Sequence, residues 1–281
     1  MIALSLPKFE EGIVNEDAAK ATSEWIAISD GAGGGGVFAD RWSDYLVKHV
    51  PETSITDYSS FDEWIDGIWE PFYNEYEEIA KKEGGMLLNR FYDEGSFATI
   101  VIVWKDGQWI SYGDSVAFCF DRKSGKLQHS FTRLVDFNAP PYLVNCKDPT
   151  DEKGYKCGKF DIHSDCVVFA ASDTLAHYIL MMYEVAHQDQ FIDELQEAVN
   201  AQTKNSNFIK VAMSQKSMNF EKDVINKLLN CKNIWNLKQH LQSRKRNGLI
   251  GHDDYSFATF EKCTNSIDKL VQSYVQEKDL E

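Results

Sequence analysis

Short apolar runs that end at or beside acidic residues are the feature that most limits how this chain can fold. Two clear runs extend from Trp25 to Ser29 and from Cys166 to Ala171. Continuous apolar runs of this length, bounded by turn residues, are typical of strands that are buried on both faces. Four acidic clusters stand at or beside such runs: Asn15-Glu16-Asp17, Asp30-Gly31, Ser172-Asp173 and Asp253-Asp254. The sequence therefore predicts buried strands whose ends carry carboxylates.

The rest of the chain alternates between helical spacing and a strand meander. Apolar residues at 38, 42, 45, 46 and 50 predict a helix over 37–50, and a second helical stretch covers 61–83. Pro71 should end or kink that second helix, because proline removes a backbone donor. Strands are predicted over 97–104, 109–112 and 116–120, with a hairpin turn at Asp106-Gly107. Residues 136–160 are irregular, 174–245 are helical with a break near 203–207, and 255–260 form a last strand.

Strands in two blocks, with helices beside and between them, predict an α+β sandwich. A chain of 281 residues can form one large domain or two small ones. There is no linker rich in Ser or Gly and no internal repeat, which favours a single domain.

Composition excludes several classes of function. The formal charge of −15 disfavours nucleic-acid binding, because phosphate contacts need clustered Lys and Arg. A hydrophobic fraction of 43% is typical of a globular protein, and no apolar run reaches the ~18 residues that a membrane span requires. Residues 1–9 lack the pattern of a signal peptide. The six cysteines (119, 146, 157, 166, 231 and 263) form no CxxC pair, so we expect reduced thiols in a cytoplasmic protein.

The acidic clusters have an ordinary interpretation and a functional one. An Asp-Gly pair such as Asp30-Gly31 is usually a turn, Asp17 could be a helix cap or a loop charge, and Ser172-Asp173 is a common helix start. Hard divalent cations such as Mg²⁺ and Mn²⁺, however, prefer carboxylate, carbonyl and water oxygens. An Asp at a strand end projects its carboxylate beyond the sheet, and the following Gly lets a carbonyl turn to the same ion.

Six motifs in order decide between these interpretations, and with them the chain resembles the metal-dependent protein phosphatases of type 2C, particularly the compact bacterial members. The resemblance runs from about residue 12 to 260. The motifs are Asn15-Glu16-Asp17-Ala18, Asp30-Gly31-Ala32-Gly33-Gly34, Gly95-Ser96-Phe97-Ala98, Gly113-Asp114-Ser115, Val168-Phe169-Ala170-Ala171-Ser172-Asp173 and His252-Asp253-Asp254-Tyr255-Ser256.

The resemblance implies a four-layer α-β-β-α sandwich of two antiparallel sheets flanked by helices. It further implies one domain over 1–281 with a helical insert at about 174–248, and a binuclear metal centre at one end of the sandwich. Asp30 would bridge two Mg²⁺ or Mn²⁺ ions and the Gly31 carbonyl would bind the first ion. Asp173 and Asp253 would hold the second ion.

Further roles follow from the same resemblance. Glu16 and Asp17 would act near the site, largely through metal-bound water, with Asp17 also counted among the metal ligands, and Asp114 matches a position used for a third, weaker ion. The implied activity is a phosphoserine/phosphothreonine protein phosphatase, a signalling hydrolase in which a metal-bridging hydroxide attacks phosphorus. Its partners would be a phosphorylated protein and a cognate Ser/Thr kinase, with neither nucleic acid nor membrane.

The chain departs from the family pattern around the substrate. Gly12 stands where the family has a phosphate-binding Arg, and Thr174, Val116 and Phe97 replace a Gly, an Arg and a Thr. His177 stands where a second Asp often occurs. These changes favour an alternative: a pseudophosphatase or phosphoprotein-binding module with the same fold. A third hypothesis is hydrolysis of a small phosphorylated metabolite.

Lys8 is the nearest cation upstream of the first acidic motif and a candidate substitute for the missing Arg. The sequence leaves the roles of two histidines open. His177 is either a packed helix residue or a contact of a third metal, and His252 either orders a ligand or water or has no role at the site.

Overall fold

Two five-stranded antiparallel sheets form the centre of the protein, which is described by a computed structural model covering residues 1–215 and 218–260. The first sheet has the order β1 (Ile2–Leu6), β12 (Tyr255–Thr259), β11 (Cys166–Ala171), β7 (Val116–Asp121), β8 (Leu127–His129). The second has the order β10 (Tyr155–Lys159), β6 (Gln108–Tyr112), β5 (Ile100–Trp104), β3 (Trp25–Asp30), β2 (Asp17–Ala21). A small ladder joins β4 (Phe97–Ala98) to β9 (Val144–Asn145).

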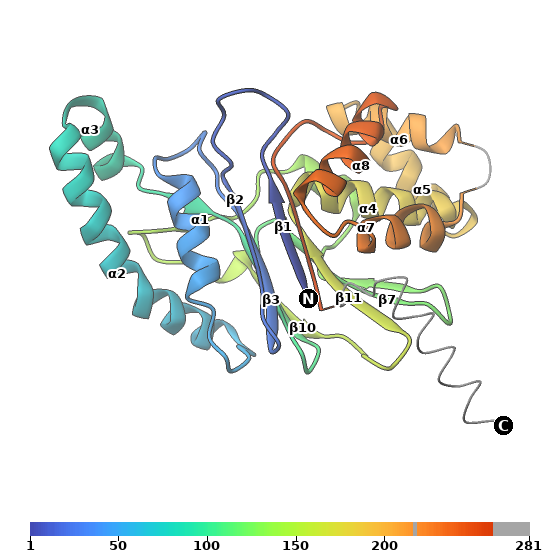
Figure 1. The fold of residues 1–281 in the computed structure, drawn as a ribbon, viewed down its shortest axis with the longest axis horizontal. Coiled ribbons are helices and arrows are strands. Elements are labelled where there is room, and N and C mark those ends of the chain that lie inside the picture. Colours follow the sequence, from blue (N-terminus) through green and yellow to red (C-terminus); the bar gives the residue numbers. More distant parts are fainter. Residues whose placement is uncertain (216–217, 261–281) are drawn as a thin grey trace.

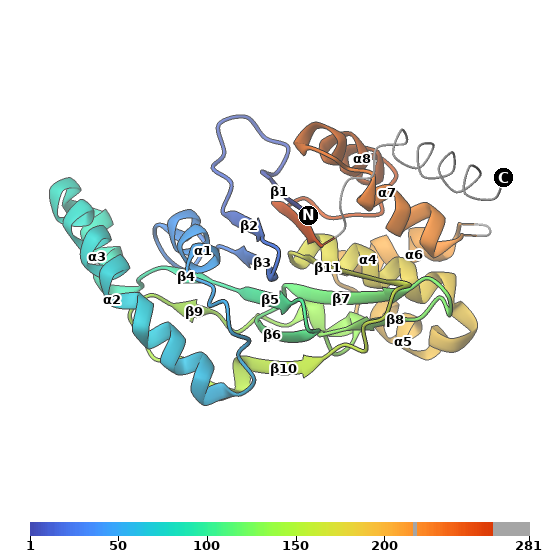
Figure 2. The ribbon, with the colours of Figure 1, turned by 60° about the horizontal axis from the view of Figure 1, so that its bottom comes forward.

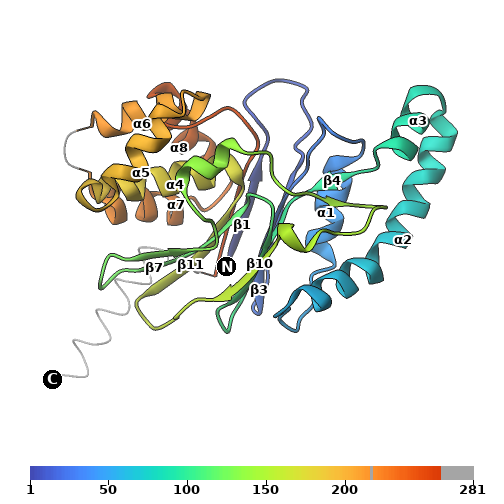
Figure 3. The ribbon, with the colours of Figure 1, turned by 180° about the vertical axis from the view of Figure 1, so that it is seen from behind.

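Helices cover the outer face of each sheet (Figures 1 and 3). On the second sheet lie α1 (Ala39–Lys48), α2 (Tyr58–Glu83) and α3 (Gly85–Asp93). On the first sheet lie α4 (Asp173–Ala186), α5 (Gln188–Asn200), α6 (Lys204–Met213), a π turn (Glu221–Ile225), α7 (Asn226–Leu229) and α8 (Ile234–Arg246). Short 3₁₀ turns occupy Leu134–Asn138 and Glu152–Gly154. The four-layer α+β sandwich with two antiparallel sheets is thereby confirmed.

The alternation of side chains along β3 explains why this strand is apolar throughout. Trp25 and Ala27 pack against the helices α1 and α2, whereas Ile26 and Ile28 face the other sheet. Successive residues of a strand point to opposite faces, so a strand between two covered faces needs apolar residues at every position. The run that the sequence showed at 25–29 is therefore a central strand, and Asp30 is its last residue.

The first sheet uses large and small residues on different faces. Phe118 and Phe169 pack in a cluster with residues of the helices, while Ala117 and Ala170 pack in a cluster with residues of the opposing sheet. Figure 2 shows the strands β11, β7 and β8 of this sheet beside the helices α4 and α5. Small side chains on one sheet leave room for the larger residues Ile26 and Ile28 of the other sheet. This packing brings the ends of β3 and β11 together at one end of the sandwich. The last residue of β3 is Asp30, and Ser172 and Asp173 directly follow β11.

Two ordinary interpretations of the sequence do not match the structure. Pro71 does not end the second helix: α2 runs from Tyr58 to Glu83. Its neighbour Phe72 is buried with its ring centroid 4.7 Å from that of Trp42, so tertiary packing outweighs the missing backbone donor. Asp17 begins strand β2 rather than a helix or a loop.

The long helical stretch is divided more often than expected. The break foreseen near 203–207 lies at 201–203, directly before α6, and others occur at His187, at 214–215, at 218–219 and at 230–233. Among the described helices, none combines the length and apolar composition that crossing a bilayer requires. The described cysteines are free thiols, as predicted, and Cys263 lies outside the described residues.

Candidate active site

Asp17 and Asp30 lie opposite each other on the antiparallel strands β2 and β3. Directly opposed residues on such a pair have Cβ atoms only about 4.5–5.5 Å apart, and like charges placed there repel. Asp17 is buried, and burial raises its pKa to about 8, with the charge of Asp173 adding to the rise. Two neighbouring strands of the second sheet therefore place carboxylates opposite each other at one buried place.

Asp173 enters this place from the first sheet, at the point where β11 passes into α4. Its position is fixed through its neighbour Ser172: the backbone N–H of Ser172 donates to the Ser256 carbonyl (3.1 Å), and the Ser172 hydroxyl accepts from the Ser256 N–H (2.9 Å). These bonds tie the start of α4 to β12. Burial, followed by repulsion from Asp253, raises the pKa of Asp173 to about 6.

Asp30 is the electrostatic centre of the group. Burial raises the pKa of its carboxyl well above the usual range, and four further aspartates add to the rise: Asp17, Asp173, Asp114 and Asp253. Burial, together with Asp173, likewise raises the pKa of Asp114 to about 7. We call Asp17, Asp30, Asp114, Asp173 and Asp253 the aspartate cluster. Its members come from five separate motifs of the chain, and each was a predicted metal ligand.

Within residues 1–215 and 218–260, the side chain of Asp17 is buried without the hydrogen bonds that would offset its loss of contact with water. Among the described residues, neither of its carboxylate oxygens has a hydrogen-bond partner within normal geometry, although both are buried. The hydroxyls of Ser172 and Ser256 lie close enough to offset a part of the rise in its pKa. A buried acceptor without a partner is costly, so a donor or a cation at this place would stabilise the folded protein.

Thr99, which the sequence did not indicate, joins Asp30 to the Gly113-Asp114-Ser115 motif. The Asp30 N–H donates to Thr99 Oγ1 (3.1 Å), the Thr99 N–H donates to the Asp30 carbonyl (2.8 Å), and Thr99 Oγ1 lies 2.8 Å from the Ser115 hydroxyl. Gly113 has a φ of +106°, and a Cβ there would lie 2.6 Å from Thr99 Cγ2. Glycine is thus required where this turn meets Thr99.

Glu16 lies at the margin of the cluster. A Cβ at Gly33 would fall 1.8 Å from Glu16 Oε1, so the carboxylate occupies the space that this glycine leaves free. Burial raises the pKa of Glu16, and the positive charge of Lys8 opposes the rise. Lys8 therefore stands on the Glu16 side of the site.

Asp254 has a structural role that its neighbour Asp253 does not share. It is 5% exposed, and its two oxygens accept the backbone N–H groups of Lys8 and Glu16, each at 2.7 Å. These bonds fasten both ends of the loop 7–16 that rises above this end of the sandwich (Figure 1). The pairing of Asp254 with two backbone donors explains why a carboxylate can be buried there.

Gly31 sits where two backbone carbonyls leave no room for a side chain. A Cβ at this position would lie 2.6 Å from the carbonyl oxygens of both Ala39 and Glu16. We expect Gly31→Ala to lower the free energy of unfolding by about 1–3 kcal/mol, because backbone atoms must move to admit the methyl group. Urea unfolding followed by circular dichroism measures this. Gly34→Ala is the matched control, since nothing lies within 4 Å of its Cβ and its loss should be much smaller; equal losses would contradict the steric account.

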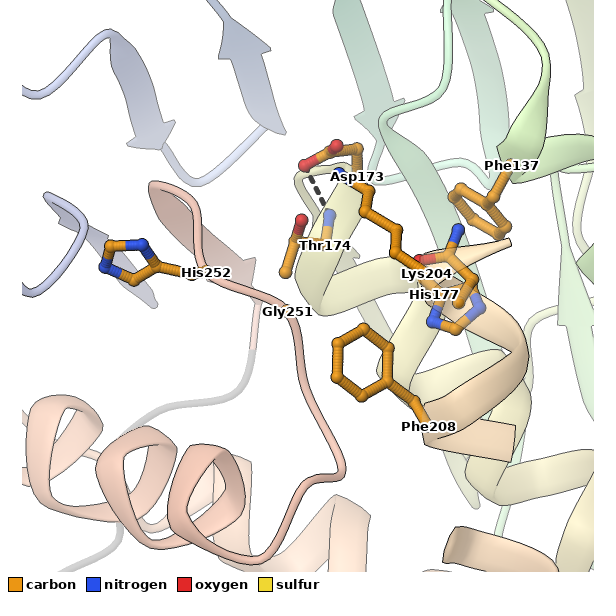
Figure 4. Close-up of a pocket in the computed structure, with 9 residues that line it drawn as sticks. Phe137, Asp173, Thr174, His177, Lys204, Phe208, Gly251 and His252 are labelled. Carbon is orange, nitrogen blue, oxygen red and sulfur yellow. Dashed lines mark hydrogen bonds between the residues drawn. The ribbon is translucent and has the colours of Figure 1, made fainter. Parts of the chain in front are cut away.

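His177 and His252 lie in different surroundings (Figure 4). His177 is buried beside Phe137, with ring centroids 5.4 Å apart, and burial lowers its pKa to about 4. His252 points to the other side, where its Nδ1 lies 3.4 Å from Oε1 of Glu10. Gly12 lies in the exposed loop with a φ of +77° and nothing within 4 Å of its Cβ position.

The aspartate cluster fits hard cations by its donor chemistry. It consists of carboxylates, which Mg²⁺ and Mn²⁺ prefer, and the unpartnered oxygens of Asp17 are free to accept one. The side chains do not yet converge: within 1–215 and 218–260, no three His, Cys, Asp or Glu residues group tightly enough to surround a single ion. Raised pKa values show that the surrounding protein does not neutralise the charge of the cluster.

No protein-family model matches the chain, and no curated protein matches it. Several solved structures resemble it. The Mycobacterium tuberculosis serine/threonine phosphatase PstP/Ppp is 13% identical over 92% of this chain and 96% of that chain, with a TM-score of 0.48. The PstP catalytic domain in complex with two manganese ions is 12% identical over 92% and 97%, with a TM-score of 0.47. PppA from Pseudomonas aeruginosa is 13% identical over 92% and 96%, also with a TM-score of 0.47. At identities and TM-scores this low, the likenesses assign neither a family nor an activity to the chain.

Proposed function

We propose that the protein is a metal-dependent phosphoserine/phosphothreonine protein phosphatase. The observation that carries this proposal is the aspartate cluster, in which Asp30 lies within electrostatic reach of four aspartates drawn from both sheets. Strongly raised carboxyl pKa values at one place are typical of functional sites. The order of the six sequence motifs adds the reaction class, because each motif that carries an acid contributes to the cluster or lies beside it.

The residues have distinct parts in this proposal. Asp30, Asp173, Asp253 and the Gly31 carbonyl would hold two Mg²⁺ or Mn²⁺ ions, and Asp114 would hold a third. When bound, such ions supply a strong nucleophile at neutral pH and offset charge on the phosphoryl oxygens. Asp17 would orient the water of the site through its two unpartnered oxygens.

Two features of the chain would keep this site in order. Asp17 is buried, and Asp30 and Asp173 are half-buried, which limits access of bulk water and strengthens electrostatic interactions inside the site. The bonds that Asp254 makes to the ends of the loop 7–16 hold Glu16 at the rim, where solvent still reaches its carboxylate. Glu16 is therefore placed to exchange protons between the site and solvent.

The proposed activity implies a substrate, a cellular location and a partner enzyme. The substrate would be a phosphorylated protein in the cytoplasm, and a Ser/Thr kinase would supply it. The net charge of −15 disfavours a nucleic-acid substrate, because phosphate contacts need clustered Lys and Arg.

One observation favours a second candidate, a pseudophosphatase or phosphoprotein-binding module. Gly12 stands where a phosphate-binding Arg is expected, and it lies in an exposed loop, so the loop offers no guanidinium at that position. The same cluster could then bind cations and a phosphorylated partner without useful turnover.

Turnover distinguishes the two candidates. We expect the purified protein to hydrolyse p-nitrophenyl phosphate and a phosphoserine peptide with Mn²⁺ or Mg²⁺, and to lose this activity when the ions are chelated. Phosphate release measures the rate, and readdition of Mn²⁺ after chelation is the control for irreversible damage. Cation binding by calorimetry, without turnover on a panel of phosphopeptides, would instead support the binding module.

A further inference from the structure

A cavity of about 310 Å³ opens directly beside Asp173, between the start of α4 and the start of α6 (Figure 4). Small-molecule sites begin at about this size, roughly 300 Å³. Without bound cations the aspartate cluster repels a phosphate dianion, because its carboxylates are negative. Cations held there would offset part of the phosphoryl charge, and positive groups at the edge of the cluster would add to this attraction. The cavity is lined by Phe137, Asp173, Thr174, His177, Lys204, Asn205, Phe208, Gly251 and His252.

Lys204 is the cation in this lining. It is the first residue of α6, and its side chain extends across the cavity toward Asp173 (Figure 4). The positive charge of Lys204 acts on both Asp173 and His177, which places the ammonium group at the boundary between the cluster and the cavity. No carboxylate of the described chain lies within 4 Å of this ammonium group, so it is available to a ligand.

The start of α6 adds a second source of positive potential. Thr203 and Ser206 form a capping box there, in which the Thr203 N–H donates to Ser206 Oγ at 3.1 Å. The backbone N–H groups at the beginning of a helix attract anions, and α6 has ten residues. Lys204 and Asn205 lie in this first turn, and both line the cavity.

His177 supplies an independent observation at the opposite wall. It is 5% exposed, it lines the cavity, and its Nε2 has no hydrogen-bond partner among the described residues. Buried polar nitrogens are normally bonded, so an unpartnered one in the wall of a cavity leaves a polar contact for a ligand to complete. The rings of Phe137 and Phe208 line the same cavity.

We propose that this cavity binds the substrate phosphoryl group, with Lys204 as its cation in place of the arginine that position 12 lacks. The inference rests on the proposed phosphatase function. An ammonium group binds a phosphate dianion as a point charge, while the first turn of α6 and His177 add polar contacts. Lys8, the other candidate, lies on the Glu16 side and does not line this cavity.

The test compares Lys204→Met with Lys204→Arg and with Lys210→Met, which removes the same charge from an exposed position of α6. With Mn²⁺ and p-nitrophenyl phosphate, we expect Lys204→Met to lower kcat/KM roughly 10- to 100-fold, mainly through KM, as loss of a charged hydrogen bond does. Inhibition by inorganic phosphate should weaken by a similar factor. Lys204→Arg should recover most of the loss, and Lys210→Met should behave as wild type.

The outcomes separate this inference from the proposed function. If the wild type turns over but Lys204→Met stays within about twofold of Lys210→Met, the assignment of Lys204 is overturned and the phosphatase stands. If the wild type shows no turnover, the phosphatase fails, and calorimetry with Mn²⁺ and inorganic phosphate decides the role of Lys204. Weaker phosphate binding by Lys204→Met would then support the site, whereas equal binding, or none by the wild type, would overturn it.

Discussion

Asp30→Asn should reduce Mn²⁺-dependent phosphate release by about 100-fold or more while the protein stays folded. Changes to groups that only orient a metal ligand cost about 10- to 100-fold, so loss of the carboxylate at the centre of the cluster should cost at least as much. Asparagine keeps the shape of the side chain and removes its charge. Initial rates at saturating Mn²⁺, measured beside the wild type, give the factor.

The stability of the same variant provides its own control. Asp30 is crowded by four other aspartates, so removing its charge relieves repulsion, and without metal the variant should melt at or above the wild-type temperature. Asp193→Asn makes the same change at an exposed position of α5 and should leave both properties unchanged. Full activity of Asp30→Asn would remove the two-metal assignment, and a lower melting temperature would show that the loss of activity came from unfolding.

The metal-free protein should become less stable as the pH rises, and cations should reverse this. The carboxyl pKa values of Asp17, Asp114 and Asp173 are raised to about 8, 7 and 6, from an ordinary value of 3.8. The folded state therefore binds more protons than the unfolded chain between about pH 4 and pH 8. Stability is greatest at the acidic end of this range and declines as the folded groups lose their protons.

Thermal unfolding in a chelator at about pH 5.5 and about pH 8 measures this effect. A difference of 1 kcal/mol shifts the melting temperature of a chain of this size by about 2–4 °C, and several coupled carboxyls should produce a larger shift. Mn²⁺ should raise the melting temperature more at the higher pH, where the ligands are ionised. A melting temperature that rises with pH in the chelator, with no response to Mn²⁺, would contradict the claim that the protein leaves the negative charge of the aspartate cluster uncompensated.

The sequence was most informative where one strand is covered on both faces. The run from Trp25 to Ser29 is apolar throughout, because both of its faces are buried, and Asp30 follows it directly. The strands β1 and β2 escaped notice because they are short, and β2 contains three alanines and a lysine, which do not favour strands by propensity. Pairing with β12 and β3 makes them strands, and pairing is a tertiary property.

The candidate site could likewise be predicted only in part, because some of its residues act through tertiary contacts. Aspartates at the ends of strands could be named from the sequence, and the structure places Asp17, Asp114, Asp173 and Asp253 within electrostatic reach of Asp30. The roles of Thr99, Asp254 and Lys204 could not be predicted, because each acts on residues distant in the chain: Thr99 on Asp30, Asp254 on the loop 7–16, and Lys204 on the cavity beside Asp173. The metal roles of the aspartates stay predictions.

Anomalous diffraction from a crystal soaked in Mn²⁺ tests the central claim most directly, namely that the aspartate cluster binds divalent cations. We predict two strong anomalous peaks at direct bonding distance from carboxylate oxygens, one bound by Asp30 and the Gly31 carbonyl and the other by Asp30, Asp173 and Asp253. A soak of Asp30→Asn under the same conditions should lose them. Manganese bound only elsewhere on the protein, with the carboxylates of the cluster still apart, would contradict the claim.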